Sequence, residues 1–256
     1  MQTSLSDKPT YRDVCRLAAT NDEFFTTFKI NQNYNEIVEH VSYELGFEYL
    51  KLIPEDFNFD IGKLNDRFGG PRTFDYPNIG QISPTSLRYL KVAFDINRLL
   101  HLSKYSIVAE IGPAYGAQAL ILKGLYGWQS YSFYDLEEPL ALTEKYLRLN
   151  GIDVDNLCDF NDTNKFDSFL GEEFDLVISN YAFSELTRQR QDAYLEKVIS
   201  SSKQGYMIMN FVSRESGIYS YSLDELLYKL RAKYPKVIPE QPLSSENNCI
   251  ILWNNV

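Results

Sequence analysis

Apolar positions recur with two different periods along this chain, and the change falls near residue 100. From residue 11 to about residue 53 they lie three or four positions apart, as in Ile37, Val41 and Leu45, which predicts helices. From Ser106 onward, short apolar runs alternate with stretches of helical spacing. Strands that alternate with helices in this way are typical of a parallel, doubly wound sheet.

The second part of the chain predicts about seven strands. The expected strands are residues 106–111, 129–135, 157–160, 174–180, 205–211, 237–238 and 249–253. Helices are expected over residues 13–19, 21–28, 34–52, 86–102, 117–122, 140–149, 188–201 and 223–233. The last two strands have only a loop between them, which indicates an antiparallel hairpin that closes the sheet.

Residues 1–100 are expected to form a helical cap with a substrate loop, and residues 101–256 a ligand-binding domain. The loop is rich in glycine and proline and begins at Gly69-Gly70-Pro71. Ser83 or Thr85 is expected to cap the helix that follows. Arg88 falls in the first turn of that helix, where the helix dipole disfavours a cation. It is therefore a candidate for binding an anion, with a surface salt bridge as the alternative.

The first strand of the second part runs into a glycine turn, Glu110-Ile111-Gly112-Pro113-Ala114-Tyr115-Gly116, which a helix follows. A strand, a glycine turn and a helix together let the backbone approach a ligand closely. Dinucleotide sites carry G-x-G-x-x-G at this point, so that a pyrophosphate can lie on the helix N-terminus. The carboxylate of Glu110 would repel a pyrophosphate. The turn therefore favours a ligand with a cationic amine and no phosphate, such as S-adenosylmethionine.

Ligands of doubly wound sheets lie over the carboxyl ends of the strands, so the residues at these ends form the expected site. Glu110 and the glycine turn are expected to hold the methionine part, and Asp135, roughly 20 residues beyond the turn, to accept both ribose hydroxyls. Asp159 and Phe160 are candidates for the adenine amine and the adenine ring face. The expected cofactor-binding set is Glu110, Gly112, Ala114, Gly116, Asp135, Leu136, Asp159, Phe160 and Asn180.

The charge balance argues against a nucleic-acid partner. The 256 residues carry a formal net charge of -10, whereas a protein that binds phosphate backbones normally presents a positive surface. Cys15, Cys158 and Cys249 lie far apart with no CxxC pair, so we expect buried thiols rather than disulfides or a zinc site. The N-terminus lacks an apolar signal core, and no apolar stretch approaches the roughly 18 residues that span a bilayer. We therefore expect a soluble, cytoplasmic protein, and a homodimer is the assembly that we consider.

The acid, the glycine turn and Asp135 resemble the class I S-adenosylmethionine-dependent methyltransferases over about residues 100–256, with Ala114 at the central position of their E/D-x-G-x-G-x-G turn. A narrower resemblance, to the sugar O-methyltransferases of bacterial surface-glycan clusters, runs through most of the chain. It rests on residues 69–71, 82–89, 110–112, 134–140 and 179–186. The resemblance implies an α/β, Rossmann-like fold, S-adenosylmethionine as cofactor, and methylation of a hydroxyl on a sugar, a nucleotide sugar or a glycan end, as in polysaccharide biosynthesis.

Methyl transfer to a sugar hydroxyl benefits from a general base. Glu185, a few residues after the fourth strand, is the preferred candidate, and its alternative role is to cap the following helix. Tyr181 and His40 are further catalytic candidates, because Tyr181 follows the same strand and His40 lies in the cap. His101 is expected to be structural.

The substrate-binding candidates are Arg88, Tyr89 and Tyr115. Arg88 could hold either the methionine carboxylate or an acidic substrate. No metal site is predicted, because no spacing of ligands is diagnostic, although Asp159, Asp162 and Glu185 could give oxygen ligands to a divalent cation.

Other functions remain open on the residues alone. A methyltransferase for a natural-product phenol or amine would use the same cofactor site and the aromatic-rich cap. A non-catalytic module that binds S-adenosylmethionine would keep the fold without the chemistry. A dinucleotide-dependent oxidoreductase is disfavoured by Glu110 and by the missing G-x-G-x-x-G.

Overall fold

The computed structural model describes residues 7–168, 172–214 and 217–254, and a seven-stranded sheet lies at its centre. The strands lie in the order β5-β4-β3-β6-β7-β9-β8. They are β3 (Ile107–Ile111), β4 (Ser130–Asp135), β5 (Cys158–Asp162), β6 (Phe174–Asn180), β7 (Ser202–Met209), β8 (Lys236–Pro239) and β9 (Cys249–Asn254). Strands β3 to β7 are parallel, and β9 is antiparallel to both of its neighbours. The predicted α/β fold with a doubly wound sheet and an antiparallel closing hairpin is confirmed.

The order of the strands reverses at β3, and this reversal determines where a ligand can bind. From β3 the chain adds β4 and β5 on one side and then returns to place β6 on the other side. Crossovers that diverge in this way leave a crevice outside the carboxyl ends of the two central strands. Glu110 pairs in register with Phe133 of β4 and Ile178 of β6, one residue before the end of β3. The acid that the sequence singled out thus lies beside the crevice.

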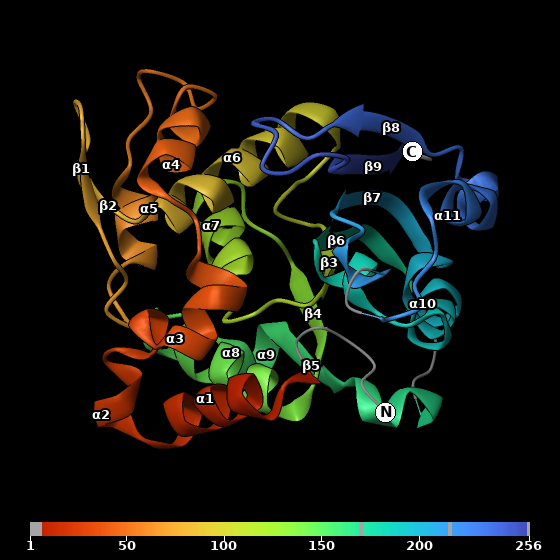
Figure 1. Ribbon diagram of the computed structural model, residues 1–256, viewed down its shortest axis with the longest axis horizontal. Coiled ribbons are helices and arrows are strands. Elements are labelled where there is room, and N and C mark those ends of the chain that lie inside the picture. Colours follow the sequence, from red (N-terminus) through yellow and green to blue (C-terminus); the bar gives the residue numbers. More distant parts are fainter. Residues whose placement is uncertain (1–6, 169–171, 215–216, 255–256) are drawn as a thin grey trace.

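Helices cover both faces of the sheet (Figure 1). Helices α6 (Pro84–Leu99), α7 (Ala117–Leu125) and α8 (Glu137–Leu149) pack on one face, and α10 (Arg188–Tyr194) and α11 (Leu223–Leu230) on the other. Residues along the strands alternate between the two cores. Leu176 and Ile178 face the first core, whereas Val177 between them faces the second.

The N-terminal helices, coloured red to orange in Figure 1, join the first of these cores. They are α1 (Pro9–Thr20), α2 (Asp22–Phe25), α3 (Gln32–Tyr34), α4 (Tyr43–Leu50) and α5 (Asp60–Asn65). The expectation of one helix over residues 34–52 is wrong, because the chain is not helical at residues 40–42, between the π-helical turn over Asn35–Glu39, which continues α3, and the start of α4. Ser42 begins α4 by accepting a 3.2 Å hydrogen bond from the backbone N–H of Leu45. A serine that caps in this way favours a new helix start over helix continuation.

The segment rich in glycine and proline contains a hairpin that the sequence did not indicate. Strands β1 (Phe74–Tyr76) and β2 (Gly80–Ile82) pair antiparallel at the outer edge of the molecule (Figure 1). Ser83 caps α6 as predicted, because its hydroxyl accepts a 3.1 Å hydrogen bond from the N–H of Ser86. Asp66 accepts hydrogen bonds of 2.6 and 2.7 Å from the backbone N–H and the hydroxyl of Ser83. These contacts hold the start of α6, and with it Arg88, in a defined position.

The remaining elements are short. They are α9 (Val154–Leu157), 3-10 turns over Phe28–Ile30, Thr163–Ser168, Ala182–Glu185, Val212–Arg214 and Arg231–Lys233, and a π-helical turn over Leu195–Ile199 that follows α10. Two strands differ from the predicted bounds by more than one residue at an end: β5 extends to Asp162, and β7 begins at Ser202 and ends at Met209.

The three cysteines are free thiols; the predicted burial holds for Cys15 and Cys249, whereas Cys158 is half-buried. No helix within the described ranges combines the length and the apolar character needed to cross a bilayer.

Candidate functional site

A cavity of about 300 Å³ opens where the carboxyl ends of β3, β4 and β6 meet the N-terminal helices. The strand ends contribute Glu110, Asp135 and Asn180 to its wall. The segment between α3 and α4, the start of α6 and the loop between β8 and β9 form the other sides. The cavity therefore lies at the reversal of strand order, and elements from both parts of the chain border it.

Glu110 is a carboxylate in the interior of the protein, with 1% of its surface exposed. The Tyr131 hydroxyl donates a 2.9 Å hydrogen bond to its Oε2 atom. Burial raises the pKa of Glu110 to about 8, the hydrogen bond from Tyr131 opposes this rise, and the negative charge of Asp135 adds to it. Within the described residues, no cationic side chain forms an ion pair with Glu110. A buried carboxylate of this kind suits a positively charged ligand.

Asp135 ends β4 and borders both this cavity and a smaller one of about 40 Å³. Its Oδ1 atom accepts a 2.7 Å hydrogen bond from the backbone N–H of Leu136. Burial raises the pKa of Asp135 to about 7, this hydrogen bond opposes the rise, and the charges of Asp7 and Glu138 add to it. Two carboxylates with raised pKa values therefore border one cavity.

The glycine turn brings the backbone close to the segment after β6. Gly112 has a φ of +72°, and a Cβ atom placed on it would lie 2.2 Å from Cβ of Ala182. Ala114 also has a positive φ, of 56°, and its carbonyl accepts a 3.1 Å hydrogen bond from Thr143. Gly112 and Ala114 border the cavity. Gly116 lies behind them at the start of α7, where a Cβ atom would meet Thr143 at 2.9 Å, so its role is to let α8 pack closely.

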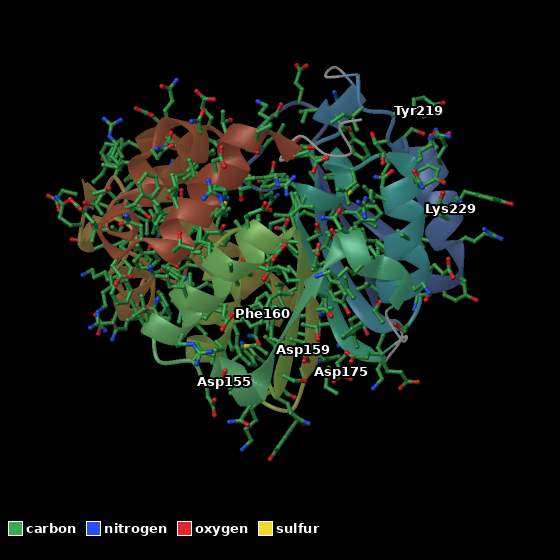
Figure 2. The ribbon with its side chains drawn as sticks, turned by 90° about the horizontal axis from the view of Figure 1, so that it is seen from below. Asp155, Asp159, Phe160, Asp175, Tyr219 and Lys229 are labelled. Carbon is green, nitrogen blue, oxygen red and sulfur yellow. The ribbon has the colours of Figure 1, made fainter. Side chains whose placement is uncertain are left out.

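Asp159 and Phe160 lie away from the cavity, unlike most of the expected cofactor residues. Because β5 runs on to Asp162, Asp159 is its second residue, and its side chain is exposed. Phe160 stacks on Phe133, with ring centroids 5.3 Å apart. Figure 2 labels Asp159 and Phe160 on β5, and neither residue borders the cavity.

The smaller cavity has other residues beside Asp135 than the expected Asp159 and Phe160. Ile111, Leu136, Thr163 and Leu186 border it. Thr163 directly follows the end of β5, so the rule that strand ends form the site would have indicated it if that end had been recognised. Leu136 thus borders the smaller cavity, and its N–H is bonded to Asp135.

Asn180 and Tyr181 follow one another at the end of β6, and both border the main cavity. The Nδ2 atom of Asn180 donates a 3.3 Å hydrogen bond to Gln118, and its Oδ1 atom is buried without a partner. Tyr181 has a φ of 70°, a conformation that persists in bulky residues only where the surroundings impose it, as at functional sites. Its hydroxyl donates a hydrogen bond to Oε1 of Glu240.

The loop between β8 and β9 borders the cavity, and no motif indicated it. Glu240 is 3% exposed, and its Oε2 atom accepts hydrogen bonds from the N–H of Ser244 at 3.1 Å and from Asn248 at 3.0 Å. Ser244 and Asn248 border the cavity, and the Oδ1 atom of Asn248 is buried without a partner. This loop reaches the site only because β9 inserts between β7 and β8.

The candidate bases Glu185 and His40 border the same cavity. Asn210 donates a 2.7 Å hydrogen bond to Oε1 of Glu185; burial raises the pKa of Glu185, and this bond opposes the rise. The N-cap of α10 is Thr187, so Glu185 does not cap that helix. Burial and, second, the positive charge of Arg88 lower the pKa of His40 to about 4, so its imidazole is uncharged at neutral pH.

Of the three substrate-binding candidates, Arg88 and Tyr89 border the cavity and Tyr115 lies in the core behind it. Nη2 of Arg88 donates a 3.1 Å hydrogen bond to the carbonyl of Val38. Tyr115 accepts a 3.1 Å hydrogen bond from Asn65, which joins the glycine turn to the N-terminal helices. The position of Tyr115 is therefore one of support rather than direct contact with a ligand.

His101 does not border the cavity. Its backbone N–H donates a 2.7 Å hydrogen bond to the side chain of Gln204 on β7, a structural contact. Within the described ranges, no group of three or more His, Cys, Asp and Glu side chains is arranged to hold a metal ion.

No protein-family model matches this sequence, and a search of curated proteins gave no match. Solved structures resemble the arrangement of its strands and helices. The mitomycin 7-O-methyltransferase MmcR is 12% identical, with a TM-score of 0.49 over 68% of this chain and 56% of its own. An rRNA methylase from Streptococcus thermophilus is 17% identical, with a TM-score of 0.45 over 65% of this chain and 92% of its own. PigF with SAH is 15% identical, with a TM-score of 0.46 over 65% of this chain and 64% of its own. The chain thus spans less than two thirds of the first and third of these proteins, and the likeness concerns the fold.

Proposed function

We propose that this chain is an S-adenosylmethionine-dependent O-methyltransferase that acts on a hydroxyl of a sugar, a nucleotide sugar or a glycan end. The observation that carries the proposal is the pair of carboxylates, Glu110 and Asp135, in the wall of one cavity at the reversal of strand order. Burial raises both pKa values, to about 8 and about 7. A ligand that brings one positive charge and several hydroxyl donors would satisfy both groups.

The residues of the cavity fit the parts of this cofactor. Glu110 would accept hydrogen bonds from the methionine amine, and Asp135 from the ribose hydroxyls. Asn180 offers a further acceptor, because its buried Oδ1 atom has no hydrogen-bond partner in the described part of the chain. A dinucleotide would instead bring its pyrophosphate to two carboxylates, an unfavourable arrangement.

When bound, the cofactor supplies a methyl group on a positively charged sulfur. The protein has to align the acceptor hydroxyl, take up its proton and exclude water. We propose Glu185 as the base, because it borders the cavity and its raised pKa makes it a stronger proton acceptor than an exposed glutamate. His40, with a pKa of about 4, is the weaker candidate. Tyr181 would position the acceptor, since its hydroxyl is already bonded to Glu240.

The sugar assignment rests on the segments that carry the resemblance to sugar O-methyltransferases. Residues 82–89 and 179–186 both contribute to the cavity wall, through Arg88 and Tyr89 in the first and Asn180 to Ala182 and Glu185 in the second. The net charge of -10 disfavours a nucleic acid as acceptor. Residues 1–100 would act as a cap over the acceptor. Because apolar cap residues such as Val41 line the same cavity, a phenol is the second acceptor class to test.

Titration calorimetry with S-adenosylhomocysteine and with NADH tests the cofactor. The wild-type protein is expected to bind the first and not the second. Glu110→Gln should weaken S-adenosylhomocysteine binding by about 10- to 100-fold, because an amide replaces the carboxylate that pairs with the amine. Glu144→Gln, whose side chain is 45% exposed on α8, is the matched control and should bind like the wild type. Binding of NADH instead, or an unchanged affinity in Glu110→Gln, would contradict the proposal.

Transfer of a labelled methyl group tests the acceptor. Sugars, nucleotide sugars and phenols are compared at equal concentration, with S-adenosylmethionine as donor. Methylation of a sugar or nucleotide sugar in preference to the phenols is the expected result. A preference for a phenol would retain the methyltransferase and replace the sugar assignment.

A further inference from the structure

Arg88 is a buried cation in the wall of the cavity, with 7% of its surface exposed. Nη2 donates a 3.1 Å hydrogen bond to the carbonyl of Val38, and the Tyr89 phenol also interacts with the guanidinium. The Nε atom is buried and has no hydrogen-bond partner within residues 7–168, 172–214 and 217–254. Burial of an arginine with an unsatisfied N–H is costly unless a ligand supplies the acceptor.

The described residues do not supply a paired carboxylate for Arg88. Among the described residues no Asp or Glu forms an ion pair with it. The charge of Glu39 does act on Arg88, although the two side chains form no ion pair. The Glu39 carboxylate interacts with Lys29, Tyr115 and Thr85, and its Oε1 atom is buried with no hydrogen-bond partner among the described residues. No described carboxylate therefore lies within ion-pair distance of Arg88, and a direct counter-ion is left for a ligand to supply.

Arg88 lies at one end of the cavity, where residues of the cap and Tyr181 also line the wall. Its guanidinium carbon is 5.2 Å from the ring centroid of Tyr89 and 5.8 Å from that of Tyr181. Its positive charge acts on His40, a residue of the cap. These neighbours place the guanidinium on the side where the acceptor would bind.

The carboxylate end of the cavity has a different charged environment. The charge that acts on Glu110 is that of Asp135, and Asp135 in turn is affected by Asp7 and Glu138. We call the wall with Glu110 and Asp135 the acidic end, which suits the methionine amine and the ribose, and the wall with Arg88 the basic end; the charges of both Arg88 and Glu110 act on Tyr89.

We propose that the methyl acceptor carries an anionic group, a carboxylate or a phosphate, and that Arg88 binds this group. The inference rests on the proposed function and narrows its substrate class to acidic or phosphorylated sugars, nucleotide sugars included. Arginine presents a planar fork of N–H donors that matches carboxylate and phosphate oxygens. The faces of Tyr89 and Tyr181 hold that fork in one orientation. The anion fixes the sugar, so that one hydroxyl is directed toward Glu185 and the cofactor.

The first test measures binding of three probes to the protein saturated with S-adenosylhomocysteine. Glucuronate carries a carboxylate, glucose 1-phosphate a phosphate, and glucose neither. We expect one of the two anions to bind at least about tenfold more tightly than glucose, and the identity of that anion tells carboxylate from phosphate. Failure of both anions to exceed glucose overturns the proposal.

Variants of Arg88 link the preference to this side chain. Arg88→Met should lose the preference for the anion, and Arg88→Lys should keep part of it, because lysine keeps the charge without the fork. Arg98→Met is the control, since Arg98 lies on the same helix with 70% of its side chain exposed. If Arg88→Met does not fold, Arg88→Lys decides the matter. A preference that is unchanged in the variants overturns the proposal.

The second test separates the acceptor from the methionine carboxylate, the other anion that Arg88 could bind. S-adenosylhomocysteine and 5′-methylthioadenosine, which lacks the amino-acid part, are titrated into wild type and Arg88→Met. We expect both affinities to change by less than about threefold. A tenfold loss for S-adenosylhomocysteine alone assigns Arg88 to the cofactor and overturns the inference. If wild-type protein binds neither compound, the proposed function fails instead, so the two failures are distinguishable.

Discussion

The hydroxyl of Tyr131 on β4 donates a 2.9 Å hydrogen bond to Oε2 of Glu110 on β3. This bond favours the charged form of a carboxylate that burial disfavours. In Tyr131→Phe the pKa of Glu110 should rise further, and the affinity for S-adenosylhomocysteine at pH 7 should fall by about five- to tenfold. Calorimetry measures this loss. At pH 9 more of the Glu110 carboxyl is ionised in both proteins, so the loss should shrink, and an equal loss at both pH values would rule out this explanation.

Glu110 should also impose a pH dependence on the stability of the free protein. Its pKa in the folded protein, about 8, lies above the ordinary value of 4.5, so the folded state holds the proton more tightly than the unfolded state. The stability from this group is therefore complete below pH 4.5 and is lost as the pH rises to about 8. Between pH 5.5 and 8 the wild type should lose on the order of 3 kcal/mol more than Glu110→Gln.

Urea unfolding at the two pH values measures this difference. Saturating S-adenosylhomocysteine should reduce the loss in the wild type, because its amine would stabilise the ionised carboxylate. Asp135 acts in the same direction and remains in both proteins, so only the part of its titration that is coupled to Glu110 enters the comparison. Equal pH slopes for wild type and Glu110→Gln would show that the carboxyl titrates near its ordinary range.

The fold and the acidic end of the cavity could be predicted because their signals are local. Strand β6 coincides with the predicted residues 174–180, an apolar run that ends at a polar Asn180. Glu110 and Asp135 reach one cavity because the ends of adjacent parallel strands meet at one edge of a sheet. The distance of Asp159 from this edge depends on where β5 ends. The end of β5 is hard to predict, because an edge strand with few buried residues has a weak hydrophobic pattern.

Other parts of the site depend on contacts between distant segments. Glu240 and Asn248 come to the cavity through the insertion of β9 between β7 and β8, and nothing in their spacing indicates this order. The division of residues 34–52 into two helices likewise depends on the packing of the segment around His40, which borders the cavity. Composition and periodicity describe elements, whereas these features arise from how the elements pack.

Gly112→Ala should destabilise the protein by more than about 2 kcal/mol. The residue has a φ of +72°, and the added methyl group would lie 2.2 Å from Cβ of Ala182. Gly151→Ala is the matched control, because Gly151 has a φ of +82° but no atom within 4 Å of the added group. That control should lose only about 1 kcal/mol, the conformational part. Urea unfolding compares the two, and similar losses would argue against a steric role for Gly112.

Tyr181 and Glu240 should act together, since the Tyr181 hydroxyl donates a hydrogen bond to Oε1 of Glu240. Tyr181→Phe should raise KM for the acceptor several-fold by loosening the loop between β8 and β9, while the affinity for S-adenosylhomocysteine changes little. A cycle with Glu240→Gln and the double variant measures the coupling, expected at about 1–2 kcal/mol in kcat/KM. Additive effects of the two substitutions would show that the bond does not contribute to acceptor binding.

Glu185→Gln should lower kcat by about 100-fold or more while leaving the affinity for S-adenosylhomocysteine unchanged, because it removes a proton acceptor and no cofactor contact. His40→Gln is the comparison and should have a much smaller effect. The rate of the wild type should rise with pH as Glu185 loses its proton. Asn210→Ala removes the 2.7 Å hydrogen bond that favours the charged carboxylate, so this rise should move to higher pH. Two results together would exclude Glu185 as the base: an unchanged pH–rate profile in Asn210→Ala and near-normal turnover in Glu185→Gln. His40 would then be the candidate base.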